Sequence, residues 1–257
     1  MARAGTLFRG IADEIRNRIT TGELAPGTRL PTESQLMDQY GTSRNTIRLA
    51  LAALENEGLI ATEQGRGSFV REWSSLTHHA TRAERVDRPS SSTDAFVAEA
   101  REAGFEPSTA FSMRIEPAVA EVADRLQIPI DTFVVLRRVV RYIDGQVSSR
   151  QDSWYPMDVA EKAGLNVPHD IKEGTVRAMA AAGYVEVGHI DEVTSRMPSP
   201  DDHQTLDVAT GVPVIVYVRT AWTEERPTRV TRVTLPADRN RIVYELGNID
   251  AYEATQK

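Results

Sequence analysis

Three residues at the start of a predicted helix carry side chains that can read DNA: Arg44, Asn45 and Arg48, in the stretch GTSRNTIRLALAALENEGLI. Arginine donates two parallel hydrogen bonds to guanine or a charge-assisted hydrogen bond to phosphate, and asparagine can pair with adenine in the same way. No acidic residue lies between Asp38 and Glu55, so this stretch is locally positive although the formal net charge is -7. These residue types and their spacing predict a local DNA-binding surface on an acidic protein.

Two helices are predicted before this stretch. The apolar residues of the first are spaced for one helix face: Leu7, Ile11, Ile15 and Ile19. Gly22 is placed to end that helix. Thr32 as N-cap, with Gln35 three residues later, predicts a capping box at the start of the second helix. Gly41 then interrupts the chain before the third helix.

Ser43 is placed to cap the third helix, which begins at Arg44 and ends at Gly58. Its predicted buried stripe is Ile47, Leu51 and Leu54, with small alanines between them. The two arginines and Asn45 lie off this stripe and are expected to point outward. The hydroxyls of Ser43 and Thr46 can bond a phosphate. The second and third helices together predict a helix-turn-helix, whose second helix enters the major groove of DNA.

A β-hairpin is predicted directly after the third helix, in the stretch LIATEQGRGSFV. Its turn is Gln64, Gly65, Arg66 and Gly67, where the glycines permit positive φ angles. An ordinary surface hairpin is one interpretation of this turn. After a recognition-type helix we interpret it as a wing, with Arg66 at its tip beside the DNA backbone or in the minor groove.

Residues 7–70 resemble the winged helix-turn-helix domain of the GntR family of bacterial transcription regulators. The matching stretches are GELAPGTRLPTESQL, YGTSRNTIRLALAALENEGLI and QGRGSFV. The resemblance implies DNA contacts at Ser34, Ser43, Arg44, Asn45, Thr46, Arg48, Gln64 and Gly65. Many relatives have arginine where this chain has Ser34, so we expect that base contact to be lost or replaced and the operator to deviate from the usual family sequence.

The composition changes after this region. Residues 74–94 are polar and rich in serine and threonine, which predicts a linker between a DNA-binding domain (1–73) and a second domain (95–257). In the second domain, alternating apolar runs such as FVVLRRVVRYID and PVIVYVRTAWTEE predict strands, and PAVAEVADRLQ and DDHQTLDVATG predict short helices. The chain is therefore expected to be of the α+β class.

Catalysis, metal binding and a cofactor are not expected. The chain has no cysteine, its five histidines are scattered, and HExxH, GxSxG, GxGxxG and P-loop patterns are absent. Asp201 and Asp202 stand where a helix would be capped, which favours a structural role. No apolar run approaches the roughly 20 residues that cross a bilayer, and the N-terminus lacks a signal-peptide core, so we expect a cytoplasmic protein without a membrane partner.

Residues 95–246 resemble the UTRA effector domain, which marks the HutC branch of the GntR family and has a fold like that of chorismate lyase. The resemblance implies an antiparallel sheet with helices, and it says nothing about catalysis. The stretches that carry it are AFVAEAREAGFEPS, EPAVAEVADRLQI, RRVVRYIDGQ, DSWYP, KEGTVRAMAAAGY and VTLPADRNRIVYEL. The positions at which UTRA sensors of sugar phosphates bind their ligand fall here on Val97, Val139, Arg141, Gln151, Thr175, Arg229 and Leu235.

Several of these positions depart from the pattern of the sugar-phosphate sensors. A hydroxyl is replaced by Val97, an arginine by Val139, two glutamates by Gln151 and Arg229, and a tyrosine by Leu235, whereas Arg141 and Thr175 are kept. Paired arginines and added aliphatic surface favour an acidic, partly apolar effector over a sugar phosphate. The alternative is that Arg141 and Arg229 form ion pairs across strands. Strand alternation places Arg137, Val139 and Arg141 on one face.

These observations predict a ligand-responsive transcriptional repressor. We expect a homodimer, because two winged helices related by a two-fold axis read a palindromic operator in double-stranded DNA. The alternative is a ligand-independent DNA-binding regulator, such as a plasmid-maintenance factor, whose second domain only dimerises. An occluded pocket and an operator affinity indifferent to every metabolite would favour that alternative.

Overall fold

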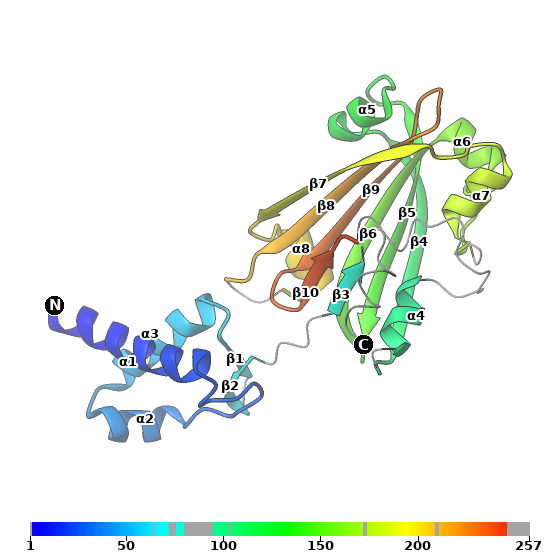
Figure 1. Cartoon of the computed structure of the whole chain (residues 1–257). Helices are drawn as coiled ribbons and strands as arrows, with labels where there is room; N and C mark the ends of the chain where they lie inside the picture. Colours follow the sequence, from blue (N-terminus) through cyan, green and yellow to red (C-terminus); the bar gives the residue numbers. More distant parts are fainter. Residues whose placement is uncertain are drawn as a thin grey trace. The chain divides into compact units, whose positions relative to one another are not determined.

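The computed structural model describes residues 2–63, 65–71, 76–79, 95–102, 104–171, 174–208 and 211–245. The chain forms two compact units. The first comprises Met1–Ser75 together with Met197–Pro213, and the second comprises Leu76–Arg196 together with Val214–Lys257 (Figure 1). No helix in the described part of the chain is both long and apolar enough to span a membrane.

The first unit contains the predicted helix-turn-helix and wing. Its elements are α1 (Ala2–Thr20), α2 (Glu33–Tyr40), α3 (Arg44–Asn56), β1 (Ile60–Glu63), β2 (Gly67–Val70) and α8 (Pro200–Leu206). The predicted capping box is confirmed, because the Thr32 hydroxyl accepts from the Gln35 N–H and the Gln35 side chain accepts from the Thr32 N–H. The left-handed backbone of Gly41 (φ 58°) ends α2 and makes the turn.

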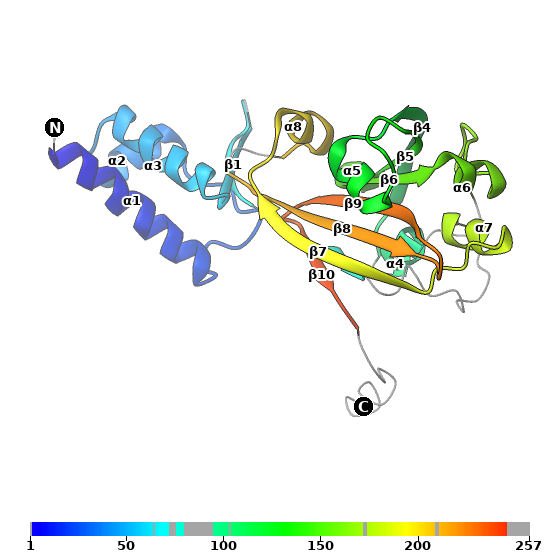
Figure 2. The same ribbon diagram turned by 90° about the horizontal axis from the view of Figure 1, so that it is seen from above.

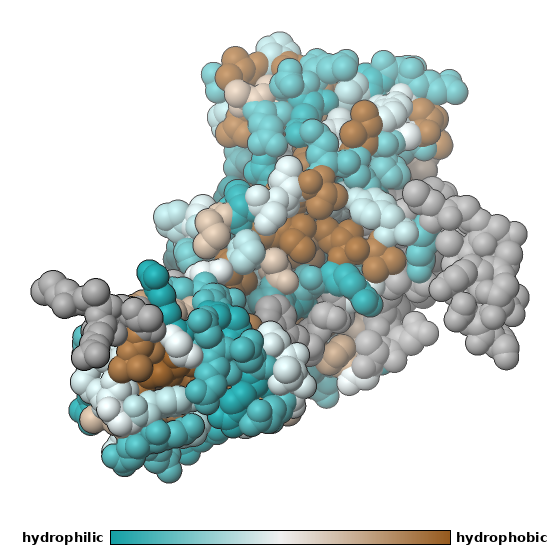
Figure 3. All heavy atoms as spheres, turned by 60° about the vertical axis from the view of Figure 1, so that its left-hand side comes forward, coloured by the Kyte–Doolittle hydropathy of each residue, from teal (hydrophilic) through white to brown (hydrophobic). Residues whose placement is uncertain are grey.

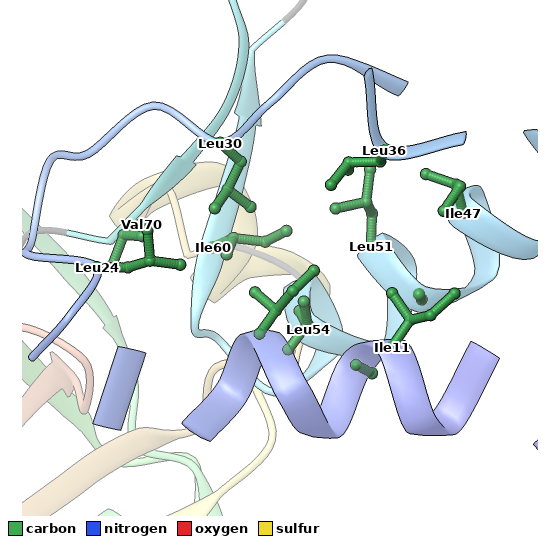
Figure 4. Packing of buried hydrophobic residues seen from close by; sticks show 12 residues of the cluster. Ile11, Leu24, Leu30, Leu36, Ile47, Leu51, Leu54, Ile60 and Val70 are labelled. Carbon is green, nitrogen blue, oxygen red and sulfur yellow. The ribbon is translucent and has the colours of Figure 1, made fainter. Parts of the chain in front are cut away.

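The core of the first unit lies where α1, α2, α3 and the hairpin meet (Figure 4). Ile47 and Leu54 of α3 are fully buried, Leu51 nearly so, and they pack with Ile11 and Ile15 of α1. This confirms the stripe predicted for α3. In α1, Leu7 is exposed and Phe8 packs against the cluster instead. Burial of this apolar surface supplies most of the free energy that holds the helices together.

Backbone pairing on both sides stiffens the hairpin. Strands β1 and β2 are antiparallel, with Ile60 opposite Val70 and Glu63 opposite Gly67. The connector after α1 adds a short third edge, where the Leu30 N–H donates to the Ser68 carbonyl over 2.8 Å. The φ of Gly67 is 106°, and a Cβ at this position would lie 3.2 Å from the Arg29 guanidinium. Gly67 therefore adopts a positive φ and leaves room for the Arg29 side chain, and a residue with a Cβ would be unfavourable on both counts.

The second unit is built on a six-stranded antiparallel sheet in the order β4-β5-β6-β9-β8-β7. Its strands are β4 (Pro107–Pro117), β5 (Phe133–Ile143), β6 (Gln146–Pro156), β7 (Gly188–Arg196), β8 (Val214–Trp222) and β9 (Pro227–Pro236). Strands β5 and β6 are joined at Asp144 and Gly145, whose positive φ angles of 50° and 79° suit a tight hairpin turn. The predicted α+β class is confirmed.

Helices lie on both faces of this sheet (Figures 1 and 2). One face is covered by α4 (Ala95–Glu102) at one end and by α6 (Met157–Lys162) and α7 (Thr175–Ala181) at the other. The opposite face carries α5 (Ala120–Leu126), which packs on β9. Two short strands, β3 (Leu76–His79) and β10 (Asn240–Val243), pair in parallel, so part of the segment predicted as linker forms a strand.

Candidate nucleic-acid interface and effector site

The residues predicted to read DNA lie at the N-terminal end of α3 and point away from the core. The Arg44 and Arg48 side chains are 67% and 70% exposed, and Asn45 is exposed beside them. Both guanidinium groups lie near the Glu33 carboxylate of α2, at 3.5 Å and 3.9 Å. Exposed pairs of this length are weak, so DNA phosphates can replace the carboxylate at small cost.

The hydroxyls of Ser43 and Thr46 bond each other at the first turn of α3. Ser43 Oγ lies 3.0 Å from Thr46 Oγ1 and accepts from the Thr46 backbone N–H, so the predicted N-cap is confirmed. Thr46 is buried and Ser43 is exposed. The cap leaves the remaining N–H groups of the first turn directed outward, and a helix N-terminus of this kind favours a phosphate.

The wing places Arg66 at the tip of the hairpin, with Gly65 (φ 79°) and Gly67 on either side. The Arg66 guanidinium lies 5.7 Å from the Phe69 ring centre, a contact that orients the side chain along the hairpin. Gln64 lies outside the described residues. Ser34 is exposed on α2, next to Glu33. Sequence reasoning missed Glu33, although its position just after the N-cap signal placed it at the helix start.

The second unit gathers the predicted effector residues on one face of its sheet. Opposed residues in antiparallel strands share a face. Val139 lies opposite Gln151, Gln151 opposite Val233, and Arg141 and Leu235 belong to the same face by alternation. Arg137 also lies on this face, as predicted, and both Arg137 and Arg141 are buried. The sequence could not show whether this face of the sheet points inward. In the structure it is covered by α4, α6 and α7.

A continuous row of hydrogen-bonding side chains crosses this face, and we call it the polar chain: Arg141, Gln151, Ser153, Thr231, Arg229 and Glu186. Arg141 Nη2 donates to Gln151 Oε1 over 3.0 Å, and Gln151 Nε2 donates to Ser153 Oγ over 3.3 Å. Ser153 Oγ and Thr231 Oγ1 are 3.0 Å apart. Arg229 completes the row by donating to Thr231 and to Glu186.

Arg229 is held in an ion pair. Of the alternative in which Arg141 and Arg229 form ion pairs across strands, the structure bears out an ion pair for Arg229, and its partner Glu186 lies outside the strands. Its Nε and Nη2 each donate to one oxygen of Glu186 over 2.8 Å, and both side chains are buried. The pair is neutral overall, so Arg229 does not add a second positive charge to the site. Glu186 precedes β7 in a stretch with no motif, which is why sequence reasoning missed it.

The remaining predicted positions surround the polar chain. Thr175, at the start of α7, accepts from the Tyr155 hydroxyl over 3.0 Å. Burial raises the pKa of that Tyr155 hydroxyl, which keeps it a neutral donor. Val97 is half-buried on α4, whose Phe96 ring lies under the Arg141 guanidinium at 5.4 Å. Leu235 packs with Tyr217 and Val233 in an apolar cluster beneath β10.

Arg137 was predicted on this face without a role, and the structure gives it one. Its guanidinium lies 4.4 Å from the Phe111 ring centre and donates to the carbonyls of Leu165, Val167 and His169 over 2.8 to 3.2 Å. Burial lowers the pKa of this guanidinium. Arg137 therefore holds the loop that follows α6 against the covered face of the sheet.

The opposite face carries charges that are satisfied within the fold. Arg138 and Arg150 both contact the buried carboxylate of Asp152, at 2.5 Å and 3.2 Å. Arg232 bonds Glu121 of α5 and lies over the Trp154 ring. The buried Asp152 carboxylate is neutralised by Arg138 and Arg150, so we assign it a structural role. Across the described chain, no group of three or more histidine, cysteine, aspartate or glutamate side chains is placed to hold a metal ion.

Comparison with known proteins agrees with both units. The family of bacterial regulatory proteins, gntR family, matches residues 7–70, and the UTRA domain matches residues 102–241. The HTH-type transcriptional regulator RB1450 of Rhizobium meliloti is 31% identical over 93% of this chain and 94% of its own. The mannosyl-D-glycerate transport/metabolism system repressor MngR of Escherichia coli K12 is 33% identical over 82% of this chain and 83% of its own.

A solved structure of a GntR-family transcriptional regulator has a TM-score of 0.65 and 28% identity, and the match covers 94% of this chain and 98% of that one. PhnF from Mycobacterium smegmatis shares the fold, with a TM-score of 0.53 at 15% identity over 92% and 98% of the two chains. The UTRA match alone spans more than half of the chain. The chain is therefore a transcriptional regulator of the GntR family, of the type that joins a winged helix-turn-helix to a UTRA effector domain.

Proposed function

We propose that the chain is a homodimeric repressor that binds a palindromic operator and is released by a small-molecule effector. The observation that carries ligand responsiveness is the polar chain, whose Arg141, Ser153, Thr231 and Arg229 are all buried. Burying so many polar groups on a sheet face costs stability relative to apolar residues of similar size. Hydrogen bonds from a bound ligand would offset this cost, which supports a ligand-binding role for the polar chain. The relative MngR, named as a repressor, supports the direction of control.

The chemistry of the polar chain favours an effector with one acidic group, some hydroxyls and an apolar part. Arg141 donates to the amide oxygen of Gln151 and places a guanidinium, a group that binds carboxylates well, at one end of the polar chain. Ser153, Thr231 and the Arg229–Glu186 pair suit hydroxyl or carbonyl groups. Val97 and Val139 supply apolar surface beside them. We propose that Thr175 and Tyr155 close the far end of this site.

Footprinting tests the DNA-binding part of the proposal. The DNA flanking the protein's own gene is digested with and without protein, and the experiment is repeated with a cell extract added. We expect a protected palindrome whose protection is lost in the extract. The double variant Arg44→Ala, Arg48→Ala serves as the control and should protect nothing. A footprint that no extract or compound changes would support the alternative, a regulator whose second unit only dimerises.

Calorimetry tests the effector part independently of DNA. The protein is titrated with N-acetylglucosamine 6-phosphate, with lipophilic carboxylic acids, and with mannosyl-D-glycerate, which carries both a carboxylate and sugar hydroxyls. We expect binding of a carboxylate, and a loss of about 5- to 150-fold in Thr231→Val, because a buried hydrogen bond to a ligand contributes about 1–3 kcal/mol. Tight binding of the sugar phosphate alone would contradict the acidic, partly apolar assignment.

A further inference from the structure

Strand β7 forms an open edge of the six-stranded sheet. Among the described strands it pairs with β8 on one side and with no strand on the other. An edge strand directs a row of backbone N–H and C=O groups outward, and these groups can pair with another strand. At nine residues, β7 is long enough to add a further strand in full register.

Exposed apolar side chains concentrate on and just before this edge. Of the twelve large apolar residues that are exposed in the described chain, four lie between residues 185 and 193: Val185, Val187, Ile190 and Val193. Each is about half exposed or more, and Figure 3 shows apolar surface on the β7 side of the second unit. Apolar surface gathered on an edge marks an interaction site.

The acidic side chains of β7 do not protect this edge. Asp191 accepts two hydrogen bonds of 2.7 Å from Arg219 of β8, and Glu192 bonds Arg125 of α5. Asp191 is thus neutralised within the unit. Glu192 is about half exposed, and its pair with Arg125 is of the weak surface kind, so Glu192 can also interact with a facing strand. The opposite edge, β4, begins and ends with proline and carries an Arg114–Glu116 pair, which are the usual features that block strand addition.

We propose that β7 pairs antiparallel with β7 of a second copy of this chain, joining the two sheets across a two-fold axis at Thr194. A second copy is favoured as the occupant because antiparallel pairing about Thr194 sets Glu192 of one copy opposite Arg196 of the other, twice. A register centred on Glu192 would instead place two exposed carboxylates opposite each other. This surface rests on the proposed homodimer and specifies how the dimer forms.

Engineered cysteines test the pairing, because the chain has no cysteine of its own. Residues on the two-fold axis lie opposite themselves at about 4.5–5.5 Å, within reach of a disulfide. We expect Thr194→Cys to give a disulfide-linked dimer under mild oxidation. The control is Ser112→Cys, also exposed but on the opposite edge, which should stay monomeric on a non-reducing gel. No cross-link at residue 194, or equal cross-linking at 112, would overturn the proposal.

Sedimentation of Ile190→Lys and Val193→Glu provides a second measurement, with Ile115→Lys as the control, because Ile115 is about equally exposed but lies on β4 at the opposite edge of the sheet. We expect both β7 variants to be monomers and the control to remain a dimer. Variants that stay dimeric would overturn the β7 surface while leaving the proposed function intact, since the footprint is measured separately. A wild-type protein that is monomeric but still protects a palindrome would overturn both the surface and the homodimer.

Discussion

The surroundings of each arginine determine what that residue can do in this chain. Arg44 and Arg48 are about two-thirds exposed and face weak carboxylate contacts, so they can exchange a protein partner for DNA. Arg219 and Arg229 are almost fully buried and bonded through two nitrogens to a carboxylate. Sequence alone could place all four on their elements, but only packing distinguishes an exposed arginine with a weak carboxylate contact from a buried arginine held by a carboxylate.

Arg48→Ala should weaken operator binding by about 1–3 kcal/mol, since it removes a guanidinium from α3, the helix predicted to enter the major groove. If Arg48 contacts a phosphate, the slope of log K against log salt should also fall by about one. Fluorescence anisotropy with a labelled operator at several salt concentrations measures both quantities. Arg114→Ala, which removes a similarly exposed arginine from the second unit, should change neither. Equal losses in the two variants would contradict a specific role for Arg48.

Asp191 should make the second unit sensitive to acid. Burial by itself would raise the pKa of this carboxyl, but hydrogen bonds and charge from Arg219, with the charge of His189, hold the pKa below its ordinary value of 3.8. A lowered folded pKa stabilises the fold above about pH 4, and this stabilisation is lost as pH falls through the folded pKa. Asp191→Asn should cost about 3–5 kcal/mol at neutral pH, because it leaves the Arg219 charge buried.

Urea unfolding of the wild type and Asp191→Asn at about pH 7, 5 and 3 tests this sign. The difference in unfolding free energy between the two proteins should be constant from pH 7 to 5 and should narrow toward pH 3. Asp201→Asn, which changes an exposed carboxylate, is the control and should track the wild type. A difference that stays constant through pH 3 would mean that the Asp191 carboxyl has the same pKa in the folded and unfolded chain.

At the scale of elements, local signals predicted most of the fold. The side chains of Thr32 and Ser43 cap the N-termini of α2 and α3, as predicted. The apolar spacing of α3 matches its buried stripe. The strands of the second unit follow from alternation and turn residues such as Gly145. These features depend on neighbours within a few residues along the chain, and that is the range over which sequence patterns are informative.

Elements that depend on distant partners could not be predicted. Strand β3 lies within a polar stretch and forms because β10, more than 150 residues later, offers it a parallel partner. The polar chain joins residues of β5, β6 and β9 with Glu186, which only the sheet register brings together. Resemblance to the UTRA domain located five residues on the covered face of the sheet: Val139, Arg141, Gln151, Arg229 and Leu235. The other three residues of the polar chain, Ser153, Thr231 and Glu186, were found only in the structure.

The Ser43 cap should connect the stability of α3 to its function. Ser43→Ala removes the side-chain acceptor for the Thr46 N–H and should cost about 1 kcal/mol of unfolding free energy. Because fraying would begin at the end of α3 that carries Arg44 and Arg48, which are predicted to contact DNA, operator affinity should fall as well. Thermal unfolding and anisotropy measure the two effects. Ser34→Ala, an exposed serine that begins no helix, is the control for stability and should leave it unchanged within about 0.5 kcal/mol.

At the scale of the whole molecule, the two units are interleaved along the chain. The segment Met197–Pro213, which lies between β7 and β8 in sequence, belongs to the first unit. Its contact with α3 is close: a Cβ on Gly211 would lie 1.8 Å from the backbone oxygen of Asn56, and Val212 is buried near Gly58. The end of α3 is thus packed against a segment that is continuous in the chain with β7 and β8 of the second unit. This packing predicts that a change in the segment alters the position of α3.

Gly211→Ala should therefore perturb DNA binding through this contact. The left-handed φ of 79° costs about 1 kcal/mol for alanine, and the clash with Asn56 must in addition displace α3 or the segment. Gly164→Ala is the matched control, because Gly164 has a φ of 65° and open space around its Cβ position. We expect Gly164→Ala to lose stability without changing operator affinity, and Gly211→Ala to lose more stability and to change operator affinity as well. Thermal unfolding measures the stability of both variants, and anisotropy measures their operator affinity. Equal changes in the two variants would show that backbone strain alone acts at Gly211 and that its packing against Asn56 does not affect DNA binding.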